Sequence, residues 1–442
     1  MVEKAASLWG KAGQRSLARS ALVEAAEQFT RALGQIASLP ATPASRREQI
    51  KLQVALINTL FHVKGYAAPE TKTAVEQARL LIEQAKALGE APEDPLLLFS
   101  VLYGLWVANL VAFNSAVCVD LATQFLSLAE KQGTTGPLMV GHQMVGISLH
   151  STGDVIGGRG HYNQALALYD PVEHRPLATR FGQDSRVVIL SRRSAALWLL
   201  GYPEAALVDA ERALTHARQV GHAASLMYAL DHGLFAQYQC GNYANATAAF
   251  KELVALAEEK GTLFWKAFGT MHQGCVCALS GQAADAVGMI TSGLAAPELA
   301  GATLWVAFFL SHLARAYAEL GNFEDALHSI GEAVTTVETT EERWCEAEVH
   351  RIAGEIALLS PEPNGAKAKA EVYFERALAI ARQQQAKSWE LRTAMSMARL
   401  WSDRGNEKQA RDLLAPIYGW FTQGFDTRDL KEAKALLDAL SP

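Results

Sequence analysis

A period of forty residues constrains the fold of this chain more than any other feature of its sequence. Two glycine series keep that interval, and an alanine stands five residues after each member of the first series. Several residue series that keep the same interval and the same relative positions indicate an internally repeated structure. The first glycine series is Gly201, Gly241, Gly281 and Gly321, the alanines are Ala206, Ala246, Ala286 and Ala326, and the second series is Gly221, Gly261 and Gly301 with Glu341 in the fourth place.

Each period predicts two helices. In the segments 190–200 and 310–320 apolar residues recur at intervals of three and four, which is typical of an amphipathic helix. The glycine that follows supplies a left-handed C-cap, and the second series is expected to cap the second helix. The repeated alanine marks the place where the two helices cross closely. Because one helical pair cannot bury both of its apolar faces, neighbouring pairs must stack into a solenoid.

One period resembles a tetratricopeptide repeat (TPR) closely. It runs Leu313-Ala314, Tyr317, Gly321-Asn322-Phe323, Ala326, Ile330, Ala333. The period exceeds the usual length of about 34 residues, and so resembles the longer repeats of large bacterial signalling ATPases and transcription activators. The resemblance implies an all-α fold, a right-handed α-solenoid of about ten helical hairpins with a C-terminal capping helix.

Extension of this register over the chain predicts one continuous array rather than several domains. The expected units span approximately 1–46, 47–92, 93–136, 137–184, 185–224, 225–264, 265–304, 305–344, 345–388 and 389–426, followed by the cap 427–442.

Several stretches resemble a more particular family, the C-terminal repeat region of bacterial proteins that join a class III adenylate/guanylate cyclase domain to an AAA-type (STAND-like) ATPase. These stretches are 65–70, 199–207, 384–388 and, most distinctively, 413–421 continuing to 424–427. The resemblance implies a chain that corresponds to the repeat region without the cyclase or the ATPase. Both a stand-alone protein and a part of a larger signalling protein remain open.

Charge and composition exclude some functions. The 442 residues include 40 Lys and Arg against 46 Asp and Glu, for a formal net charge of −6. This balance argues against nucleic acid as a ligand. Five cysteines, an odd number, and the absence of a leader in residues 1–11 are typical of reduced thiols in a cytoplasmic protein.

One uncharged run, Leu96–Val119, is long enough to cross a bilayer. It contains four polar residues, no Lys/Arg cluster flanks it, and a turn is expected near 113–116. Two buried helices of a soluble fold are therefore expected, and no membrane partner.

Neither of two clusters that suggest chemistry supports an enzyme. The glycines at 153–160 lack the Lys-Ser/Thr pair of a phosphate loop and favour a flexible turn between helices. His272, Cys275 and Cys277 cannot converge on a metal from one helix, because positions five apart diverge by about 140°. We expect no catalytic, cofactor-binding or metal-binding residue.

Two aromatic series keep the period or nearly so. Trp265, Trp305, Trp344 and Trp389 are expected to pack at seams rather than to act as binding hot spots. His232, His272 and His312 stand forty residues apart and predict a ladder along the concave groove, which would sense anions or pH near neutrality. The alternative is a duplicated structural histidine. The candidate groove contacts are Asp231, His232, Phe235, Tyr238, Met271, His272, Phe308, Ser311, His312 and Arg315.

The sequence thus predicts a non-catalytic module for protein interaction and regulation, the sensory or scaffolding half of a bacterial signalling ATPase/cyclase system. The expected partner is a protein or peptide, including an ATPase or cyclase domain encoded upstream. The alternative is a solenoid that senses a small effector in its concave groove; an enzyme is the remaining class, and the least favoured.

Overall fold

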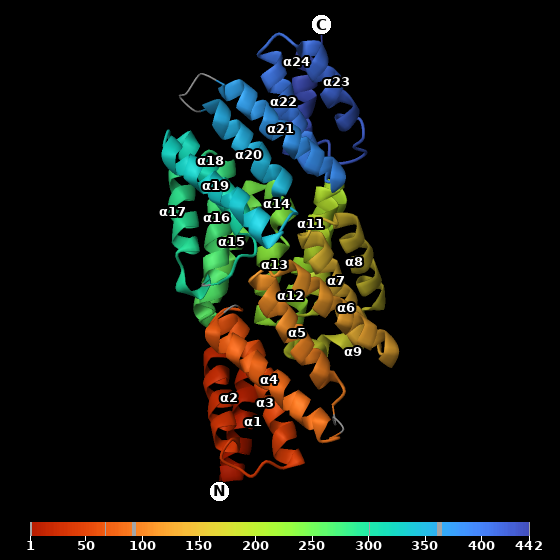
Figure 1. The fold of residues 1–442 in the computed structure, drawn as a ribbon, viewed down its shortest axis with the longest axis vertical. Helices are drawn as coiled ribbons and strands as arrows, with labels where there is room; N and C mark the ends of the chain where they lie inside the picture. Colours follow the sequence, from red (N-terminus) through yellow and green to blue (C-terminus); the bar gives the residue numbers. More distant parts are fainter. Residues whose placement is uncertain (1, 67, 91–93, 300, 360–364, 442) are drawn as a thin grey trace.

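The computed structural model describes residues 2–66, 68–90, 94–299, 301–359 and 365–441, and every regular element in these ranges is a helix (Figure 1). The chain is an all-α solenoid. Its N-terminal part consists of α1 (Val2–Ala18), α2 (Leu22–Ile36), α3 (Pro43–Val63), α4 (Pro69–Ala87), α5 (Leu96–Val111), α6 (Ser115–Gln132), α7 (Thr135–Ser151) and α8 (Val155–Leu168).

The central part follows a connection through three short helices. These are α9 (Pro171–His174), η1 (Arg175–Leu177) and α10 (Ala178–Phe181). The longer helices are then α11 (Ser185–Leu199), α12 (Pro203–Val220), α13 (Ala223–His232), α14 (Phe235–Gln239), α15 (Tyr243–Lys260), α16 (Leu263–Leu279) and α17 (Ala283–Leu294), before η2 (Pro297–Leu299).

The C-terminal part ends at the opposite pole of the elongated molecule from α1 (Figure 1). It consists of α18 (Val306–Glu319), α19 (Phe323–Thr340), α20 (Glu346–Leu359), α21 (Ala366–Gln383), α22 (Lys387–Ser402), α23 (Glu407–Tyr418) and α24 (Arg428–Ala439). The last helix, α24, buries Leu430 and Ala433 against the preceding helices, as expected of a cap.

The periodic glycines end helices as predicted, with one exception. Gly201, Gly241, Gly281 and Gly321 have φ of 85°, 92°, 78° and 80°, the left-handed region that favours glycine. Gly221 and Gly261 cap α12 and α15, and Glu341 adopts the same conformation after α19. The prediction for Gly301 is wrong, because α17 already ends at Leu294 and η2 intervenes. The repeated alanines, from Ala206 to Ala326, are fully buried where paired helices cross.

Two other local predictions need correction. The first helix of the unit 225–264 is broken into α13 and α14, and Gly233, a poor helix former, lies at the break. The glycines after Val155 form the first turns of α8 rather than a flexible turn. Gly158 packs there so closely on α7 that a Cβ would lie 2.8 Å from the carbonyl oxygen of Gly146.

The uncharged run 96–119 is divided between α5 and α6 by a turn at Phe113, whose φ is 38°. The predicted turn is confirmed. Within the described residues, no helix combines the length and the apolarity that a bilayer crossing requires.

Contacts between residues about 190 positions apart set the shape of the solenoid. The backbone N–H of Thr303 donates to the carbonyl of Val111 at 2.9 Å, and that of Arg343 to the carbonyl of Ser151 at 2.9 Å. The Ser388 hydroxyl donates to the carbonyl of Trp198. In each pair the end of one inner helix meets the beginning of another nearly five periods later. Consecutive turns of the superhelix therefore touch, and the core lies along its axis.

The periodic tryptophans occupy these junctions. Trp265, Trp305, Trp344 and Trp389 are each at most 4% exposed. The Trp265 indole donates to His62 Nδ1 at 3.1 Å, across 203 residues of sequence. The prediction of seam packing is confirmed, and the seams lie between superhelical turns as well as between neighbouring repeats.

Candidate functional site

The structure buries nine of the ten predicted groove residues. These nine are at most 6% exposed, and Arg315 keeps a side-chain exposure of 26% beside Glu319. Their helices do line the inner side of the superhelix, but the adjacent turn covers that side. The nine buried residues therefore border no open groove here, Arg315 lines a polar pocket beside Arg351 and Arg392, and the role of all ten as ligand contacts stays a prediction. The nine buried members are Asp231, His232, Phe235, Tyr238, Met271, His272, Phe308, Ser311 and His312.

Two of the three ladder histidines share one carboxylate. His232 Nδ1 lies 3.0 Å from Asp231 Oδ2, and His272 Nε2 lies 3.7 Å from Asp231 Oδ1. The Trp305 ring packs on both imidazoles, with centroids 5.7 and 5.2 Å away. Neither contact to Asp231 has hydrogen-bond geometry, so both carboxylate oxygens are buried without a hydrogen-bond partner.

The third histidine, His312, has a local partner for Nδ1 only, and its buried Nε2 has no hydrogen-bond partner. His312 Nδ1 lies 3.0 Å from the carbonyl oxygen of Phe308, one turn earlier in α18, so this nitrogen carries the proton. Its ring packs on the Phe308 ring at 4.3 Å. This arrangement fits the alternative of a duplicated structural histidine better than a continuous ladder.

Burial controls the ionisation of this cluster. It raises the pKa of Asp231 to about 8, against the opposing effect of Arg192. It lowers the pKa of His272 to about 3 and of His312 to about 4, and that of His232 well below its usual range. The three rings therefore stay neutral near pH 7, and the sensing of neutral pH by their titration has no support in this closed arrangement.

A central cavity of about 50 Å³ lies beside His232. Arg192 of α11 and Gln143 of α7 reach it, and aromatic rings including Trp106, Trp265 and Phe268 form much of its wall. Arg192, Gln143, Trp106 and Phe268 are not among the candidates predicted from the sequence. Arg192 could have been noticed, because it is a charged residue within a segment of α11 whose other buried residues carry no charge.

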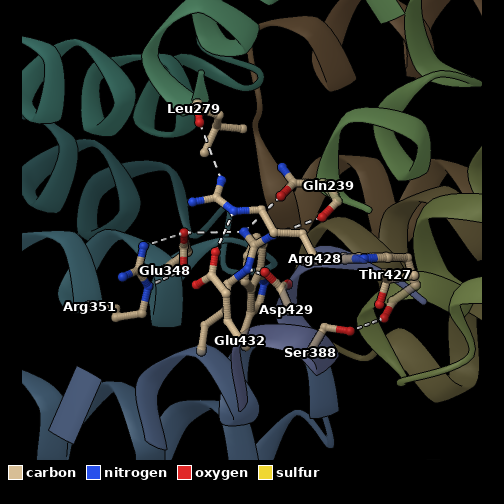
Figure 2. Close-up of polar contacts among 12 residues, drawn as sticks. Gln239, Leu279, Glu348, Arg351, Ser388, Thr427, Arg428, Asp429 and Glu432 are labelled. Atoms are coloured by element: carbon tan, nitrogen blue, oxygen red, sulfur yellow. Dashed lines mark hydrogen bonds and ion pairs between the residues drawn. The ribbon is translucent and has the colours of Figure 1, made fainter. Parts of the chain in front are cut away.

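A second polar cluster joins α20, α22 and α24 to the preceding superhelical turn (Figure 2). The Arg392 guanidinium donates to Asp429 Oδ2 at 2.7 Å, to Gln239 Oε1 at 2.7 Å and to the carbonyl of Gln239 at 3.0 Å. We call this cluster the arginine seam; it consists of Glu348, Arg351, Arg392, Arg428, Asp429 and Glu432.

Glu348 of the arginine seam is ionised although it is buried. Burial opposes the charge of Glu348, but Arg351, at 2.7 and 2.8 Å, and Arg392 bring the pKa of Glu348 down to about 2. Arg428 donates to Glu432 at 2.7 Å and reaches Tyr243 and the carbonyl of Leu279 in the other turn. These charge-assisted hydrogen bonds hold the two turns in register.

Two of the family-like stretches, 199–207 and the run from 413 to 427, contact each other. The backbone N–H of Gly424 donates to Glu204 Oε1 at 2.7 Å, and that of Ala205 to Gln423 Oε1 at 3.0 Å. A Cβ on Gly201 would lie 2.5 Å from the Trp420 ring. We call this contact of residues 201–205 with 420–424 the C-terminal clasp.

No family model matches the chain. It is 23% identical over 358 residues to an uncharacterised protein of Rhizobium meliloti (strain 1021), a match that covers 79% of this chain and 33% of that protein. The chain thus spans about a third of the length of the curated relative it matches.

Solved structures with a similar fold are helical-repeat proteins. A Rap protein complexed with competence and sporulation factor has a TM-score of 0.58 at 13% identity, covering 87% of this chain and 99% of that chain. Yeast Tom70 has a TM-score of 0.39 at 10% identity, covering 100% of this chain and 96% of that chain. A STAND protein with a tetratricopeptide repeat sensor from Pyrococcus horikoshii has a TM-score of 0.37 at 14% identity, covering 94% and 54%. The first likeness shows the fold, a solenoid of TPR-like hairpins, and nothing further rests on the other two.

Proposed function

We propose that the chain is a non-catalytic binding module whose protein or peptide partner acts by changing the pitch of the superhelix. The observation that carries the proposal is the closure of the inner face by the next turn of the same chain. A ligand for that face has to compete with the contacts between turns. Binding and superhelical pitch are then linked, because a ligand that prefers one pitch shifts the population toward it.

A partner would have to break contacts between segments that are far apart in the sequence. They include the backbone and tryptophan contacts at the junctions, the arginine seam, the C-terminal clasp and aromatic packing such as that of Phe235 on Trp344. All of them join segments far apart in the sequence, so they can open while each helical hairpin stays folded. The Rap protein with the same fold was solved with competence and sporulation factor, which supports a protein or peptide as the class of partner.

The proposed context is bacterial signalling in the cytoplasm. The resemblance to the repeat region of cyclase–ATPase proteins supports it, and so does a relative about three times as long as the matching region. The module would be one continuous array with the unit boundaries given above, and its partner an ATPase or cyclase domain encoded upstream. Neither catalysis nor a cofactor is part of the proposal.

Measurement of ATP hydrolysis tests this function. The ATPase domain proposed to be encoded upstream is assayed with and without this chain, and the chain is also assayed alone for phosphate and cyclic nucleotide. We expect no turnover by the chain alone and a several-fold change in the rate of the ATPase. Turnover by the chain alone would overturn the non-catalytic assignment, and an unchanged ATPase rate would overturn the regulatory one.

A clasp variant shows whether the effect depends on pitch. Gly424→Ala places a Cβ 2.1 Å from the Pro203 ring, whereas Gly281→Ala, at the same φ of 78°, meets open space. We expect the first variant to change the ATPase response and the second to leave it as in the wild type. If the two variants give the same ATPase response, regulation does not depend on closure of the superhelix, and the proposed link to pitch is wrong.

A further inference from the structure

The side chain of Arg192 is a buried cation whose direct partners are neutral. It is 5% exposed in the middle of α11. Its Nε donates to the Tyr228 hydroxyl at 2.7 Å, and its Nη2 donates to His232 Nε2 at 3.1 Å. Among the described residues no carboxylate lies within ion-pair distance of it, and Nη1 has no hydrogen-bond partner. A buried charge usually has a partner of opposite charge, because desolvation is costly.

The nearest acid compensates this charge only in part. Asp231 lies beyond the imidazole of His232, whose Nδ1 is 3.0 Å from Asp231 Oδ2. His232 accepts from Arg192 through Nε2, so the ring is a neutral spacer with its proton on Nδ1. Burial raises the pKa of Asp231 to about 8, so this carboxyl is largely uncharged at pH 7. The positive charge of Arg192 thus remains available to a ligand.

The central cavity lies against this charge. Arg192, Tyr228 and Gln143 line it, and Trp265 and Phe268 form part of the apolar wall. Gln143 is 2% exposed, and its Oε1 is an acceptor without a hydrogen-bond partner. A cavity of about 50 Å³ is about a third of an engineered cavity that holds benzene, and holds a few waters or a small ion.

We propose that the central cavity binds a small monocarboxylate of the size of formate or acetate, with its carboxylate on Arg192. Charge, size and wall chemistry all favour this class. The carboxylate oxygens accept from Nη1 of Arg192, and the carbon end faces the apolar wall. The cavity volume excludes a peptide or a nucleotide. The inference goes beyond the proposed function and does not depend on it.

Thermal denaturation of the whole chain in sodium formate, sodium acetate or sodium chloride at equal ionic strength tests this site. A ligand that binds only the folded chain raises Tm with its concentration. We expect formate or acetate to raise Tm more than chloride does. An equal effect of the three salts would overturn the carboxylate assignment.

A pair of adjacent arginines supplies matched variants. Arg192→Met removes the buried charge, and Arg193→Met removes a neighbouring guanidinium that pairs with Asp209 at 2.6 Å instead. We expect Arg192→Met to weaken carboxylate binding about ten- to hundredfold, as for the loss of a charged hydrogen bond, and Arg193→Met to leave it unchanged. Equal binding by the two variants would refute the role of Arg192.

Observation of the ligand bound to the wild-type protein tests the site without relying on variants that could fail to fold. Wild-type protein is titrated with ¹³C-labelled formate or acetate, and bound ligand is followed by saturation-transfer NMR. Transfer from the aromatic protons of the wall to acetate supports the site. No transfer to either ligand overturns the proposal, whether or not the ATPase experiment succeeds.

Discussion

Replacement of Arg392 by methionine tests how firmly one turn of the superhelix is held to the next. In the arginine seam this side chain donates three hydrogen bonds to Asp429 and Gln239 and lies 3.6 Å from Glu348. Its guanidinium also lies over the Trp198 and Trp389 rings, 5.0 and 5.2 Å from their centroids. The change leaves Asp429 without its partner at a side chain that is 15% exposed.

The magnitude follows from the loss of one partner of a largely buried ion pair, which costs about 3–5 kcal/mol. Asp429 is partly exposed and Glu348 keeps Arg351, so we expect the lower end, about 3 kcal/mol. Opening of the seam would then be favoured about a hundredfold more than in the wild type.

Native-state hydrogen exchange of the α14, α22 and α24 amides measures this opening, because the array need not unfold in one step. Arg399→Met on the same helix is the control, since Arg399 is 48% exposed and its pair with Glu432 is expected to contribute at most about 1 kcal/mol. If exchange in Arg392→Met is no faster than in Arg399→Met, the seam does not hold the turns together.

Two further predictions concern the clasp and the buried histidines. Gly201→Ala should lower the Tm measured by calorimetry clearly more than Gly321→Ala. Both residues have positive φ, but of the two only Gly201 faces a ring, that of Trp420, which would lie 2.5 Å from the added Cβ. Equal losses of Tm would mean that backbone strain alone matters. The folded-state pKa of His272 is about 3, below the ordinary value of about 6.5, so the unfolded chain takes up the proton first and stability falls as the pH falls from about 6.5 toward 3. His272→Phe should therefore reduce the loss of stability between pH 7 and 5 by about 2 kcal/mol, as read from denaturant midpoints, and an unchanged pH dependence would show that His272 titrates in the folded state.

The forty-residue period was sufficient to predict where helices end and cross, because helix caps and close helix crossings each depend on a single residue. A positive φ after a helix favours glycine, and a close crossing requires a small side chain, so columns such as Gly201 and Ala206 could be interpreted from one repeat. The exceptions have local causes that the period masks. Gly233 lies within an otherwise helical segment, and α17 ends before Gly301 can act as its cap.

The pitch of the superhelix could not be predicted in this way. It is the sum of small rotations at successive interfaces, and it determines whether residues about 190 positions apart touch. The same histidine positions would line an open groove at a longer pitch and the interior at a shorter one. The exposure of the histidines depends on contacts such as that of Trp265 with His62, for which the repeat pattern holds no signal.

The distance between two labels on consecutive turns tests the central claim, closure of the superhelix, most directly. Ile156 of α8 and Gln383 of α21 line one cleft, and Ile156 is 40% exposed. Cysteines introduced at these positions, with Cys277 replaced by serine, would carry spin labels for pulsed electron paramagnetic resonance. Closed turns predict one short and narrow distance distribution. A long, broad distribution in the free protein would show that the turns are apart in solution, and would contradict the account.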